Sequence, residues 1–301
     1  MTAALPSMPG TPAALSKPVP MPGIRELHYR VGAPVRAHFP GHHRSARGDS
    51  GFEFRGHASL LDAPDPRRLD LHASLRDPFG NWAVRVYSQR MAVPVVMVAD
   101  LSASMGFVGA CAKQAVLADF VDSLAGSAWR TGDSFGFIGC DSAVRMDVLL
   151  PPTRARGAGS ALAHTLRGLN LAGRSAHGLR DAHRHLGRQR SLVFLVSDFH
   201  LPLAEVEAVL ASMAQHERVP VVLWDAAEFS LTPQRGLVQV LDPESGRRQW
   251  LWWRPALRAQ WRAAARQRCE SLLRLFRAQR LMPLFIEGRF DADAVTRHFL
   301  S

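Results

Sequence analysis

The apolar residues of this chain form short uninterrupted runs that alternate with longer stretches in which apolar residues recur at helical spacing. The clearest run, Val93 to Ala99, is apolar at every position. A strand of this kind is buried on both faces, as in a parallel sheet. Further buried strands are predicted over residues 133–140, 191–200 and 219–224. Strands that alternate with helical segments predict an α/β fold with a doubly wound, mostly parallel sheet and helices on both faces.

The remaining elements follow from the same reasoning. Apolar spacing of three and four residues predicts helices covering the sheet, and alternation predicts an edge strand over 143–150 and a hairpin around the turn at 242–246. The predicted helices cover residues 110–124, 175–188, 203–215, 255–280 and 291–300, with a further one starting near 161, and a last strand covers 282–287.

Three regions are expected along the chain. Residues 1–23 are rich in proline, alanine and serine, which prevents regular structure and predicts a disordered tail. Residues 24–89 form a separate N-terminal region, and residues 90–301 form the α/β domain. No apolar run approaches the roughly 20 residues needed to span a bilayer, and no signal peptide is evident. We therefore expect a cytoplasmic protein.

The formal net charge of the 301 residues is +11, which suggests a nucleic-acid partner, since basic side chains neutralise phosphates. Only Lys17 and Lys113 are lysines, however, and an arginine bias of this kind follows from a GC-rich genome. No nucleic-acid-binding motif is present. An acidic protein surface is an equally good partner, and nucleic-acid binding is kept as an alternative.

Candidate chemistry is concentrated directly after the first buried run. Asp100, Ser102 and Ser104 place one carboxylate and two hydroxyls on a short turn before a helix. Ligands bind beyond the carboxyl ends of strands in open α/β sheets, and hard oxygen donors suit Mg²⁺ or Mn²⁺. Either serine could instead cap the following helix.

This D-x-S-x-S pattern resembles the metal-ion-dependent adhesion site of von Willebrand factor A domains. The resemblance implies that Asp198, at the end of a neighbouring strand, is a second acidic metal residue, and that Ser160 stands where A domains have a metal-binding threonine. Helix capping is the alternative for both. Two carboxylates with neutral hydroxyls would leave the ion a position for a carboxylate from a partner.

A longer resemblance extends from about Gly51 to Phe199. The chain is similar to domain-of-unknown-function family 58 (DUF58) in the order and spacing of its motifs, and the matching residues are Gly51, Glu53, Phe54, Asp65, Pro66, Arg67, Arg68, Asp70, Ala73, Ser74 and Arg76. Leu71 and Leu75 depart from the family pattern. The resemblance implies work beside a MoxR-type AAA+ ATPase, and one branch, MxaS, implies maturation of methanol dehydrogenase.

Two pairs of arginines are candidate partner-binding residues. Arg67 and Arg68 are flanked by aspartates, which could lock a turn through bidentate hydrogen bonds, or they could dock a partner. Arg258 and Arg262 belong to a row of arginines at four-residue steps, where like charges repel and an acidic partner would relieve the repulsion. A solvated helix face is the simpler interpretation of that row.

The sequence therefore predicts a non-enzymatic adaptor whose Mg²⁺ or Mn²⁺ captures an acidic side chain of a client or of the ATPase. No phosphate-binding G-x-x-x-x-G-K loop is present, so ATPase activity of its own is not expected. A metal-dependent hydrolase is the third hypothesis. The helical spacing of His177, Asp181 and His185 could make another metal triad, although a solvated face is favoured.

Overall fold

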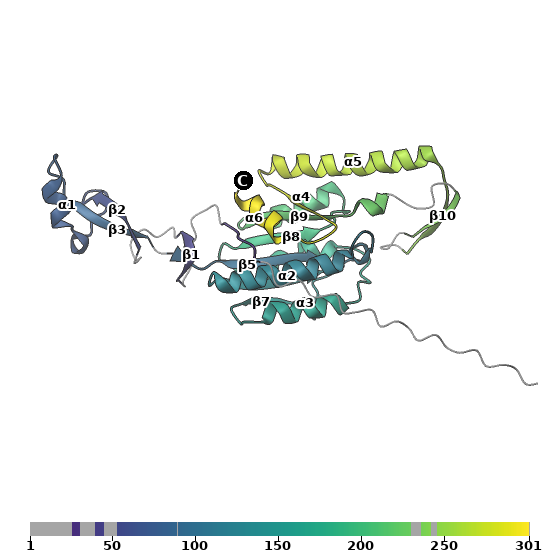
Figure 1. Ribbon diagram of the computed structural model, residues 1–301, viewed down its shortest axis with the longest axis horizontal. Helices are drawn as coiled ribbons and strands as arrows, with labels where there is room; N and C mark the ends of the chain where they lie inside the picture. Colours follow the sequence, from purple (N-terminus) through teal and green to yellow (C-terminus); the bar gives the residue numbers. More distant parts are fainter. Residues whose placement is uncertain are drawn as a thin grey trace, which may run out of the picture.

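The computed structural model describes residues 26–30, 40–44, 53–88, 90–229, 236–241 and 246–300. A six-stranded sheet in the order β12-β9-β8-β5-β6-β7 lies at its centre (Figure 1). All neighbouring pairs are parallel except β6 with β7. The strands are β5 (Pro94–Asp100), β6 (Ser134–Cys140), β7 (Leu150–Thr153), β8 (Leu192–Ser197), β9 (Glu217–Trp224) and β12 (Leu284–Glu287). The predicted α/β architecture is confirmed.

Helices cover both faces of this sheet because its strands are apolar on both sides. Val95 and Met97 of β5 belong to one core cluster, whereas Val96 and Val98 belong to the other, as the period of two along a strand requires. The first cluster is completed by α2 (Lys113–Arg130), α3 (Ala158–Gly168) and α6 (Ala292–Leu300), and the second by α4 (Leu203–Ser212) and α5 (Pro255–Ala278). Figure 1 shows α5 and α2 on opposite sides of the strands.

Two predicted elements are replaced by turns. The edge strand expected over 143–150 begins only at Leu150, because Arg145 ties the preceding turn together through Asp141 and Asp147, with Nε 2.9 Å from Asp147 Oδ1. The helix expected over 175–188 is two short 3-10 turns, η3 (His177–Arg180) and η4 (Ala182–His185). His177 instead contacts Glu205 at 3.0 Å, so no triad with Asp181 and His185 forms.

The hairpin predicted near the turn at 242–246 is confirmed. Strands β10 (Gly236–Leu241) and β11 (Arg248–Trp253) pair in antiparallel register, with Leu237 opposite Trp252. A short 3-10 turn, η5 (Ala226–Phe229), follows β9 on the way to this hairpin. Residues 242–245 of the predicted turn lie outside the described residues.

A small unit built on β2 (Glu53–Ser59) and β3 (Ala83–Ser88) lies at one end of the molecule in Figure 1. Asp70 organises it, because its carboxylate accepts hydrogen bonds from Arg85 Nε at 2.7 Å and from the backbone of Ala73 at 3.1 Å and caps α1 (Leu71–Arg76). These bonds lower the pKa of Asp70 well below its usual value. Asp70, more than the flanking arginines, locks the turn.

The candidate docking arginines of this unit differ in their contacts. Arg68 pairs with Asp65 at 3.2 Å and lies over the ring of Tyr87, within the 3-10 turn η1 (Pro66–Arg68). Arg67 is exposed. Two further short strands, β1 (Pro40–Arg44) and β4 (Arg90–Met91), pair between this unit and the main sheet. The predicted tail at residues 1–23 lies outside the described residues.

Residues 26–30 pack against the α/β domain, although the sequence assigned them to the N-terminal region. Leu27 is buried in the main core, and its N–H donates to Ser127 Oγ at 3.1 Å. The Tyr29 hydroxyl donates to Asp133 Oδ2 at 2.5 Å, and the other Asp133 oxygen accepts from Val93 N at 2.8 Å. Asp133 therefore links this segment to the beginning of β5.

Helices α2 and α3 approach each other closely at Gly159. A Cβ atom there would lie 2.1 Å from the Cβ of Ala125. We predict that Gly159→Val destabilises the protein by about 1 to 3 kcal/mol, because overpacking forces the helices apart. Urea unfolding followed by circular dichroism measures the change. Gly168→Ala in the same helix, where a Cβ meets open space, is the control; equal losses for both would contradict the prediction.

Candidate metal centre

Four neighbouring strands of the sheet deliver an aspartate to the same edge. Asp100 is the last residue of β5, and Asp141, Asp198 and Asp225 directly follow β6, β8 and β9. This clustering follows from the parallel arrangement, because the carboxyl ends of parallel strands meet at one edge. The edge is acidic in a chain whose net charge is +11.

The turn after β5 brings the predicted D-x-S-x-S oxygens together. Asp100 is 1% exposed and accepts from Ser102 N at 2.9 Å and from Ser197 Oγ at 2.7 Å. The hydroxyls of Ser102 and Ser104 are 3.2 Å apart, and Ser104 also donates to Asp198. Asp100, Ser102, Ser104 and Asp198 thus form one buried oxygen cluster, as the sequence predicted.

Helix capping, the simpler interpretation of these residues, does not describe what they do. Ser102 precedes the 3-10 turn η2 (Ala103–Gly106) but makes no side-chain capping bond to it. Asp198 lies before α4, whose N-cap is Pro202. Their side chains face each other across the strand ends instead.

The turn that carries Asp198 is held in an uncommon conformation. Phe199 has a φ of 54°, in the left-handed region that non-glycine residues rarely occupy. Its ring packs edge to face against Phe276 at 5.4 Å, its N–H donates to Ser197 Oγ at 2.8 Å, and Arg268 donates to its carbonyl. Such local strain persists only where the surroundings enforce it, as at binding sites.

Lys113 is the cluster residue that sequence reasoning missed. It is the first residue of α2, its side chain is 4% exposed, and its Nζ lies 3.0 Å from Asp198 Oδ2 and also contacts Glu228. A lysine at a helix N-terminus is unfavourable for the helix dipole, so these two carboxylates account for its position. A lysine in an arginine-rich chain, just after the acidic turn, was the available signal.

His200 and Glu228 complete the surroundings of Asp198. His200 Nε2 lies 3.3 Å from Glu228 Oε2 and 4.0 Å from Asp198 Oδ2. Ligand atoms of these three side chains lie within 4.8 Å of one another, but the Lys113 ammonium group already contacts two of the three. We therefore place the candidate metal at the Asp100 cluster.

The pKa shifts in the cluster follow from burial and from the charges that face each other there. Burial, followed by the charge of Asp198, raises the pKa of Asp100 to about 6. Burial alone would raise the pKa of Asp198 and lower that of Lys113, but His200 and Lys113 lower the first, and Asp198 and Glu228 raise the second. Lys113 and His200 thus face Asp198 and Glu228, whereas Asp100 is affected by burial and by the charge of Asp198.

Ser160 is not part of the cluster, which corrects the prediction for this residue. It lies exposed on α3, and its hydroxyl donates to Asp122 Oδ1 of α2 at 2.5 Å. The segment that reaches the acidic turn comes later in the chain, where Gly173 O accepts from Ala103 N at 2.8 Å. The physical reason is that α3 runs antiparallel to α2: its start, at Gly159, faces Ala125, whereas its end, at Leu166, accepts a hydrogen bond from Gln114 next to Lys113.

The oxygen cluster fits a hard divalent cation. Its donors are carboxylate and hydroxyl oxygens, which Mg²⁺ and Mn²⁺ prefer, and a cation bound there would offset the burial and the Asp198 charge that raise the pKa of Asp100. Asp100, Ser102, Ser104 and Asp198 are the residues that would hold it.

Arg258 and Arg262, the candidate partner-binding residues predicted from the sequence, lie on α5, where Arg258 is half-buried and Arg262 is exposed.

Residues 64–271 match the profile of the family described as proteins of unknown function, DUF58. The chain belongs to the DUF58 family. Over 101 residues it is 34% identical to an uncharacterized protein in the moxR 3′ region of Paracoccus denitrificans, which covers 34% of this chain and 96% of that protein.

Solved structures similar to this DUF58 chain include an aerotolerance-related membrane protein from Bacteroides fragilis, with 13% identity and a TM-score of 0.41 over 69% of this chain and 95% of that one. BatB from Bacteroides thetaiotaomicron is similar at 12% identity and a TM-score of 0.40, over 69% and 98% of the two chains.

The expectation of a cytoplasmic protein is contradicted, because the first of these similar structures is that of a membrane protein. None of the helices in the part of the chain that the structure describes combines the length and apolar character needed to cross a bilayer. The cytoplasmic assignment is therefore withdrawn.

Asp100→Asn is predicted to stabilise the protein at pH 7 when divalent cations are removed with EDTA. The pKa of Asp100 is about 6 when folded and about 3.9 when unfolded, so ionised Asp100 costs stability above pH 6 and the cost disappears below pH 4. We expect a gain of about 1 to 3 kcal/mol at pH 7 that vanishes near pH 4, measured by urea unfolding.

Asp147→Asn is the control for this change. Arg145 lowers the pKa of Asp147, so its replacement should give no gain at pH 7. A loss of stability on Asp100→Asn at pH 7 in EDTA would contradict the prediction.

Lys113→Met is predicted to have the opposite effect. It leaves Asp198 and Glu228 buried without their cation, which costs about 3 to 5 kcal/mol when one partner of a buried pair is removed. Lys113→Arg keeps the charge and should lose less. Thermal unfolding in EDTA and in excess Mg²⁺ tests both variants: Mg²⁺ should raise the melting temperature of Lys113→Met more than that of wild type. Equal increases in melting temperature for the two proteins would exclude a carboxylate that both Lys113 and Mg²⁺ contact.

Proposed function

We propose that this DUF58 protein is a non-enzymatic adaptor with a von Willebrand A-like domain, in which Asp100, Ser102, Ser104 and Asp198 hold Mg²⁺ or Mn²⁺ and the ion captures a carboxylate of a partner protein. The observation that carries the proposal is the convergence of these four buried oxygen donors at the ends of two neighbouring parallel strands. It is supported by the raised pKa of Asp100, whose buried carboxylate lies beside the charge of Asp198.

The residues of this chain perform distinct tasks in the proposed site. Asp100 anchors the ion, and Ser197 and the Ser102 N–H orient its carboxylate. Ser102 and Ser104 contribute oxygens without charge, so the bound ion keeps net positive charge. A bound Mg²⁺ offers its remaining coordination positions to outside oxygens, since it requires near-octahedral oxygen ligation.

A partner would approach from the side on which the cluster is accessible. Asp100 and Asp198 are 1% and 2% exposed, whereas Ser104 is 8% exposed and the side chain of His200 is 37% exposed. Glu228 borders the same side. A partner carboxylate approaching here would pass His200, whose pKa is raised because Glu228 and Asp198 outweigh the effect of burial.

We propose a MoxR-type AAA+ ATPase and its client enzyme as partners. The Paracoccus denitrificans relative, described as lying in the moxR 3′ region, supports this association. The DUF58 resemblance suggests maturation of a client, which could be a methanol dehydrogenase-like enzyme. An acidic side chain on the ATPase or on the client would complete the metal site.

The test has two measurements. Isothermal titration of the purified protein with MgCl₂ and with MnCl₂ should show one site in wild type, a loss of at least about tenfold in affinity for Asp100→Ala, and no change for Asp293→Ala, an exposed aspartate on α6. Capture of the purified MoxR-type ATPase from the same genome should then require Mg²⁺ and fail in EDTA.

Each result bears on a separate part of the proposal. Equal metal binding by wild type and Asp100→Ala would remove the metal site. Metal binding with equal ATPase capture in Mg²⁺ and EDTA would remove the ion from the interaction and leave the adaptor role to another surface.

A further inference from the structure

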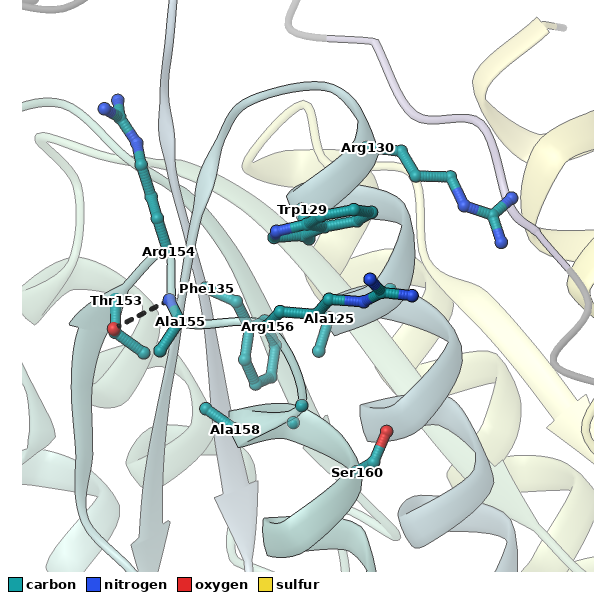
Figure 2. A pocket seen from close by; sticks show the side chains of 13 residues that line it. Ala125, Trp129, Arg130, Phe135, Thr153, Arg154, Ala155, Arg156, Ala158 and Ser160 are labelled. Atoms are coloured by element: carbon teal, nitrogen blue, oxygen red, sulfur yellow. Dashed lines mark hydrogen bonds between the residues drawn. The ribbon is translucent and has the colours of Figure 1, made fainter.

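A cavity lies at the amino ends of the parallel strands, whereas the acidic cluster lies at their carboxyl ends. It measures about 200 Å³ and lies between the end of α2, the start of β6 and the segment that joins β7 to α3 (Figure 2). Phe135 begins the wall on β6, and Trp129 forms the wall on α2. The cavity is therefore separated from Asp100 by the length of β5 and β6.

Arg156 is held in place by Trp129. Its guanidinium carbon lies 5.0 Å from the centre of the Trp129 ring, and Figure 2 shows its side chain extending along that ring. The guanidinium group therefore makes a cation–π contact with the ring. The N–H groups at its edge have no hydrogen bond or ion pair to any residue that the structure describes. A guanidinium group positioned in this way can donate two parallel hydrogen bonds to a carboxylate.

The remainder of the cavity is basic and partly apolar. Arg130 and Arg154 extend outwards from its rim in Figure 2, and none of the lining residues that the structure describes is acidic. Arg130 pairs with Glu26, a residue outside the lining. Helix α3 begins here after Gly157, whose φ is 84° and which supplies no side-chain cap. The positive end of that helix dipole adds to the charge of Arg156.

The size of the cavity indicates what it accommodates. Small-molecule sites usually enclose about 300 to 1,000 Å³, so a cavity of about 200 Å³ is better suited to one or two side chains of a larger partner. Trp129 remains 45% exposed beside it. Tryptophan and arginine are the residues most enriched among those that dominate binding energy at protein interfaces.

We infer that this cavity, which we call the Trp129 pocket and define by Trp129, Phe135, Arg130, Arg154 and Arg156, binds an acidic segment of a partner protein. A carboxylate of the segment pairs with Arg156, and a neighbouring apolar side chain packs against Phe135 in the wall formed by β6. The net charge of +11 attracts such a segment over a longer range. This inference needs no metal ion and is independent of the proposed function.

Fluorescence anisotropy with a defined peptide tests the inference on the full chain in EDTA and at low ionic strength. The probe is the fluorescein-labelled peptide Gly-Glu-Asp-Leu-Glu-Asp-Gly, compared with its amide counterpart Gly-Gln-Asn-Leu-Gln-Asn-Gly. We expect the acidic peptide to bind and the amide peptide to bind at least about tenfold more weakly. Arg156→Gln and Trp129→Ala should each weaken the acidic peptide about fivefold to tenfold.

Arg297→Gln is the matched control, because it removes the same charge from an arginine whose side chain is 70% exposed on α6. It should change the affinity less than about twofold. Arg156→Lys keeps the charge without the planar fork and should give an intermediate loss. Circular dichroism confirms that each variant is folded.

Three outcomes would overturn the inference. The first is absence of binding by the acidic peptide, and the second is an equal loss for Arg156→Gln and Arg297→Gln, which would show only an effect of net charge. The third is binding of adenosine monophosphate that depends on Arg156 when the peptide does not bind, which would assign the pocket to a small phosphate compound instead.

Discussion

The contact between Lys113 and Asp198 is the interaction on which the acidic edge depends. Parallel strands bring several carboxylates to one place, and burial makes their mutual repulsion expensive. The ammonium group at the start of α2 offsets part of that cost for Asp198, while Asp100 retains a raised pKa. Lys113 thus balances Asp198 from within the protein, and in the proposed function a divalent cation would do the same for Asp100.

This division explains why a basic chain carries an acidic site. Exposed arginines such as Arg262 and Arg266 lie on the outer helices, whereas the strand ends deliver aspartates to the interior edge. The turn through Phe199 fixes the position of the neighbouring Asp198. Arg268 donates to the carbonyl of Phe199, and the buried Phe199 ring packs against Phe276 of α5. Charge is therefore distributed by topology: the ends of the parallel strands are acidic, and the Trp129 pocket at their beginnings is basic.

Much of this architecture could be predicted from the order of residues alone. Uninterrupted apolar runs identified β5, β6, β8 and β9, and the D-x-S-x-S spacing identified the Asp100 turn, because both are local patterns. Lys113, His200 and Glu228 could not be placed in this way, since they meet only after α2, β8 and η5 have packed together. Ser160 was misassigned for the same reason: a loop of suitable composition does not reveal which end of α2 it contacts.

The segment around Leu27 and Tyr29 belongs to the α/β domain, although the sequence predicts that this domain begins near residue 90. It lies against α2, and the N–H of His28 donates to Thr296 on α6 at 3.0 Å. Residues nearly the whole sequence apart are thus fastened side by side over the same core. A fragment that begins near residue 90 would lack residues 26–30 and would expose the apolar surface beneath Leu27. An α/β domain that folds on its own must therefore include this segment.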